Sequence, residues 1–155
     1  MLIFKLLHIW SMFAAVTLLV GEALFYARAI WRADVAGLAA VRRLVGGRPV
    51  IGAALLVAGI VFGLLAALTG GFDLLAGWLL AAYALIAALF AVNGSPWVQR
   101  LPRLGLEAME AEAGQRPVDD VVRAMAGTRT AVLVVVTLNV ALFAAIVLDM
   151  VVKPL

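Results

Sequence analysis

Apolar residues fall into four long runs along the chain, separated by polar or glycine-rich breaks. The runs cover residues 2–27, 50–69, 74–92 and 130–152. Each is close to the ~20 residues that an α-helix needs to cross the ~30 Å hydrocarbon core of a bilayer. The pattern therefore predicts an all-α integral membrane protein, with four antiparallel transmembrane helices bundled into one domain over residues 1–155.

The two longer breaks carry helical patterns of their own. After the first run, apolar residues recur at helical spacing until Gly46-Gly47: Trp31, Val35, Leu38, Val41 and Val45. Arg32 and Arg43 lie opposite them. Before the fourth run, Pro117 favours a helix start, and Asp119 with Arg123 forms an i,i+4 charge pair. We expect amphipathic helices at the membrane surface in both breaks.

The cationic residues predict the orientation. Ten of the twelve lie in these two breaks, at 28–48 and 100–129, and the turn at 70–73 has none. By the positive-inside rule both breaks face the cytoplasm of a bacterial inner membrane, and both termini face outside.

The amino-acid composition excludes several kinds of functional site. The chain is 66% hydrophobic, whereas soluble domains are nearer half apolar. The absence of cysteine excludes disulfides, thiolate metal sites and cysteine catalysis, and a single histidine excludes a multi-histidine site within one chain. The net charge of +3 comes from arginines placed for topology, so nucleic acid is not an expected partner. The expected surroundings are lipid, with another membrane protein or a second copy as partner.

The first run has one polar face. At helical spacing His8, Met12, Glu22 and Tyr26 share it, and Trp10 lies on the opposite side. His8 and Glu22 are fourteen residues apart, which is about 21 Å along a helix, so they belong to different depths. For His8 the alternatives are an interfacial histidine bonded to a neighbour, or a metal ligand. For Glu22 they are a partner for Arg28 at the cytoplasmic edge, or a proton or substrate site.

Glycines of the second run form a seam at spacings of seven, four and seven: Gly52, Gly59, Gly63 and Gly70. Small residues let membrane helices approach closely. The first interpretation is therefore close helix packing. The alternative is room for a flat cofactor against bare backbone, with Gly59 and Gly63 at its centre.

Four further polar or aromatic residues lie in the third and fourth runs: Trp78, Tyr83, Asn139 and Asp149. The predicted orientation brings His8, Trp78 and Asp149 to a similar outer depth. Asp149 is then placed to accept a hydrogen bond from the second ring nitrogen of a ligating His8, or it pairs with Lys153. Asn139 suits a hydrogen bond between helices or a ligand contact.

The run Leu6-Leu7-His8-Ile9-Trp10 with Gly21, and Gly77-Trp78 followed by Tyr83, resemble the DUF2269 family of integral membrane proteins. More distantly, the chain is similar to the CopD-type copper-resistance proteins and the HemJ-type protoporphyrinogen oxidases. The HemJ-type resemblance implies that His8 ligates a b-type haem. Because the chain has no second histidine, the sixth position would be open or filled by Met12, water or a second protomer.

Three functions follow as hypotheses. The first is a haem-associated redox membrane protein. The second is a non-enzymatic anchor or scaffold subunit of a larger membrane complex. The third is a small transporter with Glu22 and Asn139 in a polar path. No nucleophile–base pair, phosphate-binding loop or metal cluster appears in the sequence, so no particular reaction is indicated.

Overall fold

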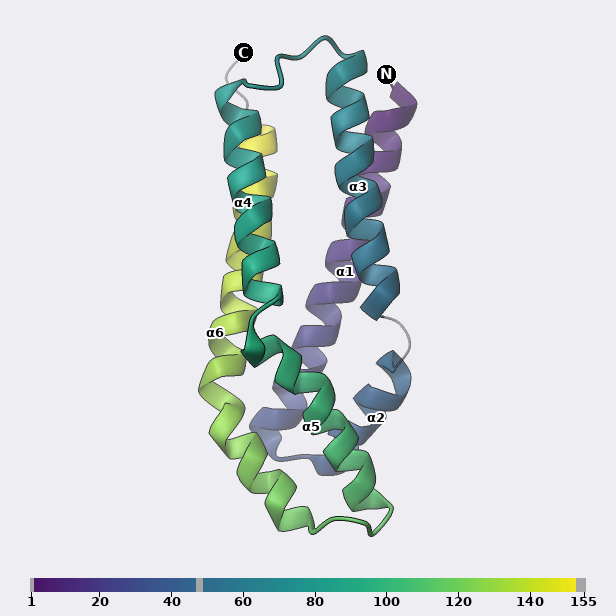
Figure 1. The fold of residues 1–155 in the computed structure, drawn as a ribbon, viewed down its shortest axis with the longest axis vertical. Coiled ribbons are helices and arrows are strands. Elements are labelled where there is room, and N and C mark those ends of the chain that lie inside the picture. Colours follow the sequence, from purple (N-terminus) through teal and green to yellow (C-terminus); the bar gives the residue numbers. More distant parts are fainter. Residues whose placement is uncertain (1, 47–48, 153–155) are drawn as a thin grey trace. The chain divides into compact units, whose positions relative to one another are not determined.

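The computed structural model describes residues 2–46 and 49–152, which form helices and the turns between them (Figure 1). Within this part of the chain the helices are, in order, α1 (Leu2–Arg32), α2 (Val35–Val45), α3 (Pro49–Thr69), α4 (Gly77–Asn93), α5 (Pro96–Glu112) and α6 (Val118–Val151). The predicted all-α class is confirmed.

Three helices, α1, α3 and α6, are each long and apolar enough to cross a membrane. The pair α4 and α5 meets the same test as one span bent by 41°. By itself α4 is only 17 residues long and begins at Gly77 rather than near residue 74. Its late start reflects the preceding turn, where the carboxylate of Asp73 accepts a hydrogen bond from the Leu75 N–H at 2.9 Å.

Both α1 and α6 are longer than a bilayer requires. They contain 31 and 34 residues, which is about 46 and 51 Å at 1.5 Å per residue. The chain correspondingly separates into two compact units. Among the described residues, unit 1 comprises 2–19, 49–89 and 141–152, and unit 2 comprises 20–46 and 90–140. The single transmembrane domain predicted from the sequence stays a prediction, since hydropathy does not reveal where a long helix passes from one compact unit into another.

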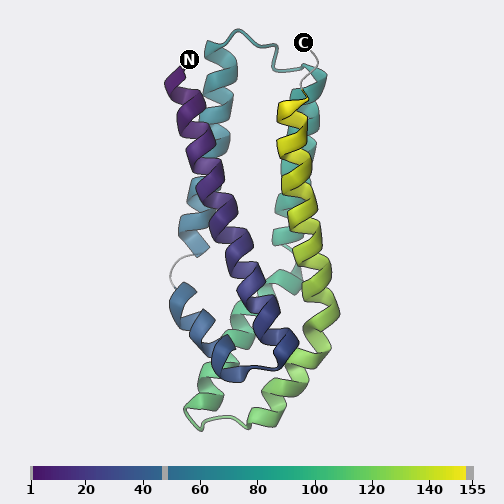
Figure 2. The ribbon, with the colours of Figure 1, turned by 180° about the vertical axis from the view of Figure 1, so that it is seen from behind.

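Unit 1 contains the first part of α1, all of α3, most of α4 and the last part of α6. Helix α1 runs beside α3, as the front and back views show (Figures 1 and 2). The predicted faces of α1 are confirmed here, since Ala15 is fully buried while Trp10 and Phe13 are 70% and 69% exposed. Large apolar side chains on the outside are what a lipid environment permits.

Unit 2 has a core of its own, built by the end of α1, helix α2, helix α5 and the start of α6. Its buried members are Tyr26, Ala29, Ile30, Leu38, Ala39, Leu101, Leu104, Ala108, Ala111, Val121, Met125 and Val132. The apolar face of α2 meets another helix, since Leu38 and Ala39 are fully buried and α2 packs against α5. Its expected location at the membrane surface stays a prediction.

The break between α1 and α2 explains this packing. Ala33 adopts a left-handed conformation (φ 53°), and Asp34 caps α2 by accepting a hydrogen bond from the Gly37 N–H at 2.8 Å. The chain therefore turns back on itself after Arg32. Neither glycine nor proline marks the break, so the sequence suggested one continuous amphipathic segment.

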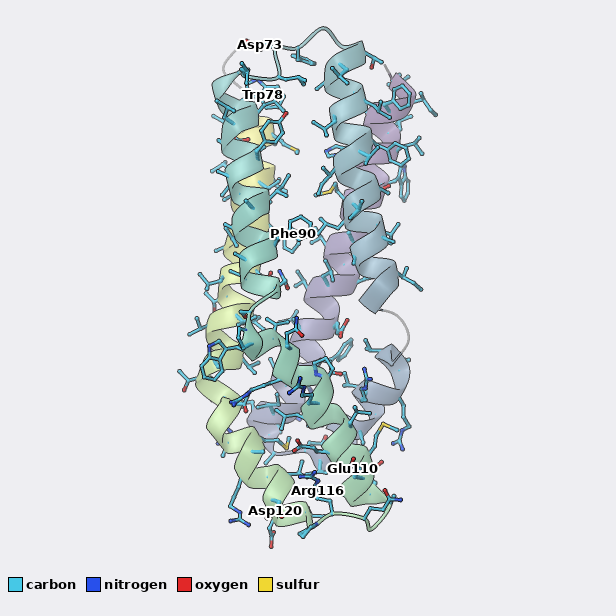
Figure 3. The ribbon with its side chains drawn as sticks, viewed as in Figure 1. Asp73, Trp78, Phe90, Glu110, Arg116 and Asp120 are labelled. Carbon is cyan, nitrogen blue, oxygen red and sulfur yellow. The ribbon has the colours of Figure 1, made fainter. Side chains whose placement is uncertain are left out.

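Helix α6 begins at Val118, which confirms the predicted start after Pro117. It continues without a break to Val151, so the expected surface helix and the fourth span are one helix. Arg123 forms its ion pair with Asp120 rather than with Asp119, and its Nε donates to the backbone oxygen of Asp119. Figure 3 shows Glu110, Arg116 and Asp120 near the turn between α5 and α6. Nε of Arg116 lies 3.1 Å from a carboxylate oxygen of Glu110.

Candidate functional site

Close contact between α1 and α3 positions the only histidine of the chain. A Cβ added at Gly52 would lie 3.1 Å from Leu19, and one added at Gly59 would lie 2.6 Å from the sulfur of Met12. At Gly63 it would lie 2.9 Å from His8 Nδ1. Gly52, Gly59 and Gly63 of the seam therefore pack against α1, as the first interpretation predicted, whereas Gly70 lies against Phe72. The space that a flat cofactor would need against the α3 backbone is occupied by Met12 and His8.

The imidazole of His8 makes one hydrogen bond in the structure. Its Nδ1 lies 2.6 Å from the backbone oxygen of Gly59. Because a carbonyl oxygen can only accept, Nδ1 carries the hydrogen, and the neutral ring keeps its lone pair on Nε2. The absence of a side chain at Gly63 allows this approach, since a Cβ there would also lie 3.0 Å from Cε1.

The Gly59 carbonyl is the group that accepts the hydrogen bond from His8 Nδ1. A ligating histidine usually donates its second ring nitrogen to a carboxylate, a carbonyl or water. The sequence pointed to Asp149 for that role, whereas the structure gives a backbone carbonyl. The sequence signal that could have found it is the glycine four residues after Gly59, which exposes the carbonyl to a neighbouring helix.

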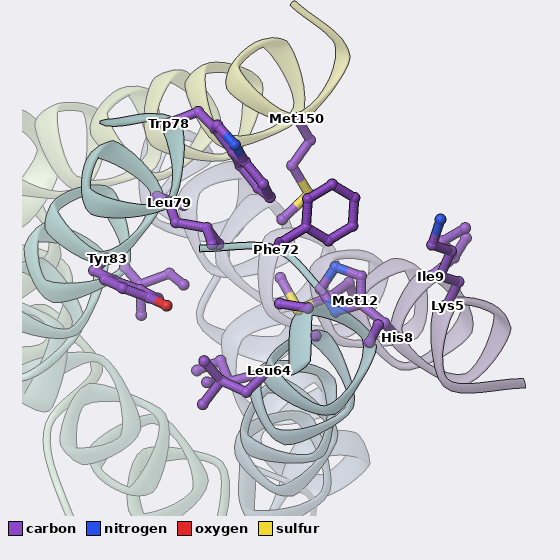
Figure 4. A pocket seen from close by; sticks show the side chains of 16 residues that line it. Lys5, His8, Ile9, Met12, Leu64, Phe72, Trp78, Leu79, Tyr83 and Met150 are labelled. Carbon is purple, nitrogen blue, oxygen red and sulfur yellow. The ribbon is translucent and has the colours of Figure 1, made fainter. Parts of the chain in front are cut away.

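An apolar pocket of about 300 Å³ lies in unit 1 beside His8. This volume is at the small end of the range for ligand sites, ~300–1,000 Å³. Its walls come from α1, α3, α4, the turn before α4 and α6 (Figure 4). Few polar side chains line it: Lys5, His8, Trp78 and Tyr83. Figure 4 shows the Tyr83 hydroxyl directed into the pocket from α4.

Aromatic rings cover part of the pocket. The rings of Phe72 and Trp78 meet edge to face with centroids 5.8 Å apart, and the Lys5 ammonium lies 5.9 Å from the Phe72 ring centre. Phe72 sits over the pocket because the turn before it uses Gly71 in a left-handed conformation (φ 70°). Figure 4 shows the His8 ring beside Met12 and close to Phe72.

Of the residues predicted for the site, His8, Met12, Gly63, Trp78 and Tyr83 line the pocket. Gly59 contributes through its carbonyl oxygen. The sequence interpretation missed Lys5, Phe72 and Met150, which also line it. Phe72 lies in a turn and Met150 near the end of a helix, so neither showed a periodic signal.

Asp149 is adjacent in sequence to Met150 of the pocket. One of its carboxylate oxygens is buried and, among the described residues, has no hydrogen-bond partner. Its predicted pairing with Lys153 falls outside the described residues.

The remaining predicted polar residues lie in unit 2. Tyr26 is 1% exposed, and its hydroxyl oxygen is buried with no hydrogen-bond partner among the described residues. The ion pairs of the described residues do not include the Glu22–Arg28 pair that the sequence suggested.

Asn139 accepts a hydrogen bond from the Asn93 amide at 2.7 Å and donates to the Val135 oxygen at 3.1 Å. The predicted link between helices is thus confirmed for Asn139. Both polar groups of its amide are used inside unit 2.

No family model matches the chain, and no curated protein or solved structure is detectably similar to it. The family resemblance suggested by the first and third helices stays a prediction. What can be said of function rests on the chemistry of the pocket.

Proposed function

We propose that the protein is a bacterial membrane protein that binds a b-type haem in unit 1, with Nε2 of His8 as the axial ligand. The observation that carries this is the hydrogen bond from His8 Nδ1 to the Gly59 oxygen, at 2.6 Å. It fixes the tautomer whose free nitrogen can bind a metal, and it holds the ring in place. An imidazole with that arrangement at the wall of an apolar pocket is the donor that haem proteins use.

Other residues of the pocket are of the kinds that a haem site uses. Among the described residues no three His, Asp or Glu side chains cluster as metal ligands, so a metal here would depend on one protein nitrogen and a macrocycle. Phe72 and Trp78 supply aromatic walls, and Lys5 supplies a cation for a propionate. Met12 and Met150 are the soft donors of the pocket available for a second axial position. Once bound, a haem supplies one-electron redox chemistry.

The size of the pocket favours a second candidate. A cavity of about 300 Å³ suits a flat lipophilic molecule smaller than haem. A hydroxylated aromatic such as a quinol would donate its O–H to the lone pair on His8 Nε2 and could bond to Tyr83. Both candidates use the same nitrogen and the same apolar walls, and they differ in the absorption spectrum of the bound molecule.

The spectrum of the detergent-purified full chain, expressed with haem supplementation, tests the proposal. Wild type should show a Soret band and near-stoichiometric haem, and His8→Ala should lose both. Ser11→Ala is the matched control, because Ser11 lies on the same helix outside the pocket. A wild-type protein without haem, but with an extractable aromatic lipid that His8→Ala lacks, would favour the quinol candidate.

We infer further that the spans form an antiparallel four-helix arrangement with the arginine-rich parts of unit 2 in the cytoplasm and both termini outside. The support is the number of membrane-competent helices and the distribution of arginines. Because the chain has no cysteine, single cysteines at Asp73 and Arg116 can be labelled without background. Labelling from opposite sides is expected, and labelling of both from one side would contradict the topology.

A further inference from the structure

A second cavity lies in unit 2 at the break between α4 and α5. It has a volume of about 310 Å³ and is lined by Gly94, Pro96, Gln99, Arg100 and Arg103. Unlike the pocket of unit 1, its lining includes two guanidinium groups. Arg100 and Arg103 are three residues apart on α5, so both project from the same side of the helix.

These two arginines have no acidic partner among the described residues. Arg43, Arg116 and Arg123 each form an ion pair with a carboxylate. Across residues 2–46 and 49–152, no such pair involves Arg100 or Arg103. The cavity therefore presents two uncompensated positive charges, which favour an anion.

One uncharged polar side chain of the lining adds to these charges. Gln99 supplies an amide N–H beside Arg100 and Arg103. A ligand with several oxygen acceptors, such as a phosphate, would suit the two guanidinium groups and this amide together.

The neighbouring residues indicate that this phosphate belongs to a lipid headgroup. Trp97 is 50% exposed, and the Arg100 guanidinium lies 5.3 Å from its ring centre. Exposed tryptophan beside arginine is typical of the headgroup level of a membrane. The cavity also directly follows α4, the apolar part of a candidate span.

We propose that this cavity binds the phosphate of an anionic phospholipid, held by Arg100 and Arg103. Basic pockets at the cytoplasmic ends of membrane helices can recognise lipid headgroups in this way. The site is independent of the pocket in unit 1 and of any haem. A lipid held here would stabilise the bend between α4 and α5.

The test is equilibrium binding of a fluorescent phosphatidylglycerol to the detergent-solubilised full chain, with phosphatidylcholine as the neutral comparison. Wild type should prefer phosphatidylglycerol. At roughly 1 kcal/mol for each arginine, Arg100→Gln with Arg103→Gln should weaken binding about 30-fold. Both side chains are exposed, so we expect this variant to fold. Its melting temperature in phosphatidylcholine micelles checks this.

The control variant is Arg116→Gln with Arg123→Gln, which removes the same net charge from arginines that are already paired. It should weaken binding less than threefold. Equal losses in the two variants, or no preference of wild type for phosphatidylglycerol, would overturn the proposal. Displacement of the lipid by millimolar inorganic phosphate would also overturn it, because the site would then take free phosphate.

Discussion

Helices α1 and α6 each contribute to both units, yet different interactions stabilise the inside of unit 1 and the inside of unit 2. In unit 1, α1 approaches α3 through glycines, and the histidine bonds to a backbone oxygen. In unit 2, amphipathic helices bury their apolar faces in a common core. The ion pairs of the described residues, Arg43–Glu112, Arg116–Glu107, Arg116–Glu110 and Arg123–Asp120, are all in unit 2.

These two kinds of packing are those that lipid and water, respectively, favour. Lipid offers apolar side chains the same environment inside and outside, so helices associate through close packing and internal hydrogen bonds. Water drives apolar faces together and leaves charges outside. One continuous helix such as α1 can therefore present large apolar residues outward at Trp10 and bury Tyr26 and Ile30 further along.

The largest expected effect is in the core of unit 2. Leu38 is fully buried, so Leu38→Ala should lower the free energy of unfolding of this unit by about 3 kcal/mol. Leu44→Ala, on the same helix but 60% exposed, is the control. Hydrogen exchange of the α2 and α5 amides measures the loss. A similar loss of protection in α3 would show that the two units do not pack separately.

The glycine seam gives the corresponding test in unit 1. Gly59→Leu would place a side chain where Met12 lies, and overpacking costs about 1–3 kcal/mol. We expect a lower melting temperature in detergent and a weakened His8 site. Gly21→Leu is the control, because a Cβ there meets nothing within 4 Å. Equal melting temperatures for the two variants would contradict close packing as the basis of unit 1.

A smaller effect is expected for the hydrogen bond between Asn93 and Asn139. Asn139→Ala should destabilise unit 2 by about 1 kcal/mol, since the net contribution of one such hydrogen bond is modest. A double-mutant cycle with Asn93→Ala isolates the pair. A coupling free energy near zero would mean that the two side chains do not depend on each other.

The smallest effect is expected at a surface ion pair. Arg43 lies 2.9 Å from Glu112 and is more than half exposed, so Arg43→Gln should cost only about 0.5 kcal/mol. The difference from wild type should vanish in 1 M salt, because exposed charges are then screened. A loss above about 2 kcal/mol that salt does not change would show that this pair matters more than its exposure suggests.

Much of the fold could be predicted from hydropathy. The apolar runs located α1, α3 and α6, and Pro117 marked the start of α6. The break at Ala33 could not be predicted, because alanine rarely ends a helix in a left-handed conformation. An amphipathic pattern also does not predict whether the apolar face of α2 contacts lipid or another helix, because either contact would bury the apolar face.

The candidate site was predicted in part. The polar face of α1 and the seam of α3 pointed to His8, Met12 and Gly63, because helical spacing determines which residues share a face. Helical spacing alone did not identify the partner of His8, since it is a backbone oxygen and every residue has one. The signal for it is Gly63, which leaves the Gly59 carbonyl open to α1. Phe72 was missed for a similar reason, because its position depends on the path of a turn.

The most direct test of the account is whether an imidazole at the position of His8 is what holds the ligand. His8→Gly, expressed with haem supplementation, removes the ring and leaves a space beside Gly63 that free imidazole can enter. We predict that the purified variant lacks the Soret band of wild type, and that added haem with imidazole restores it while haem alone does not. An unchanged Soret band in His8→Gly, or no band in wild type under the same conditions, would contradict haem ligation by His8.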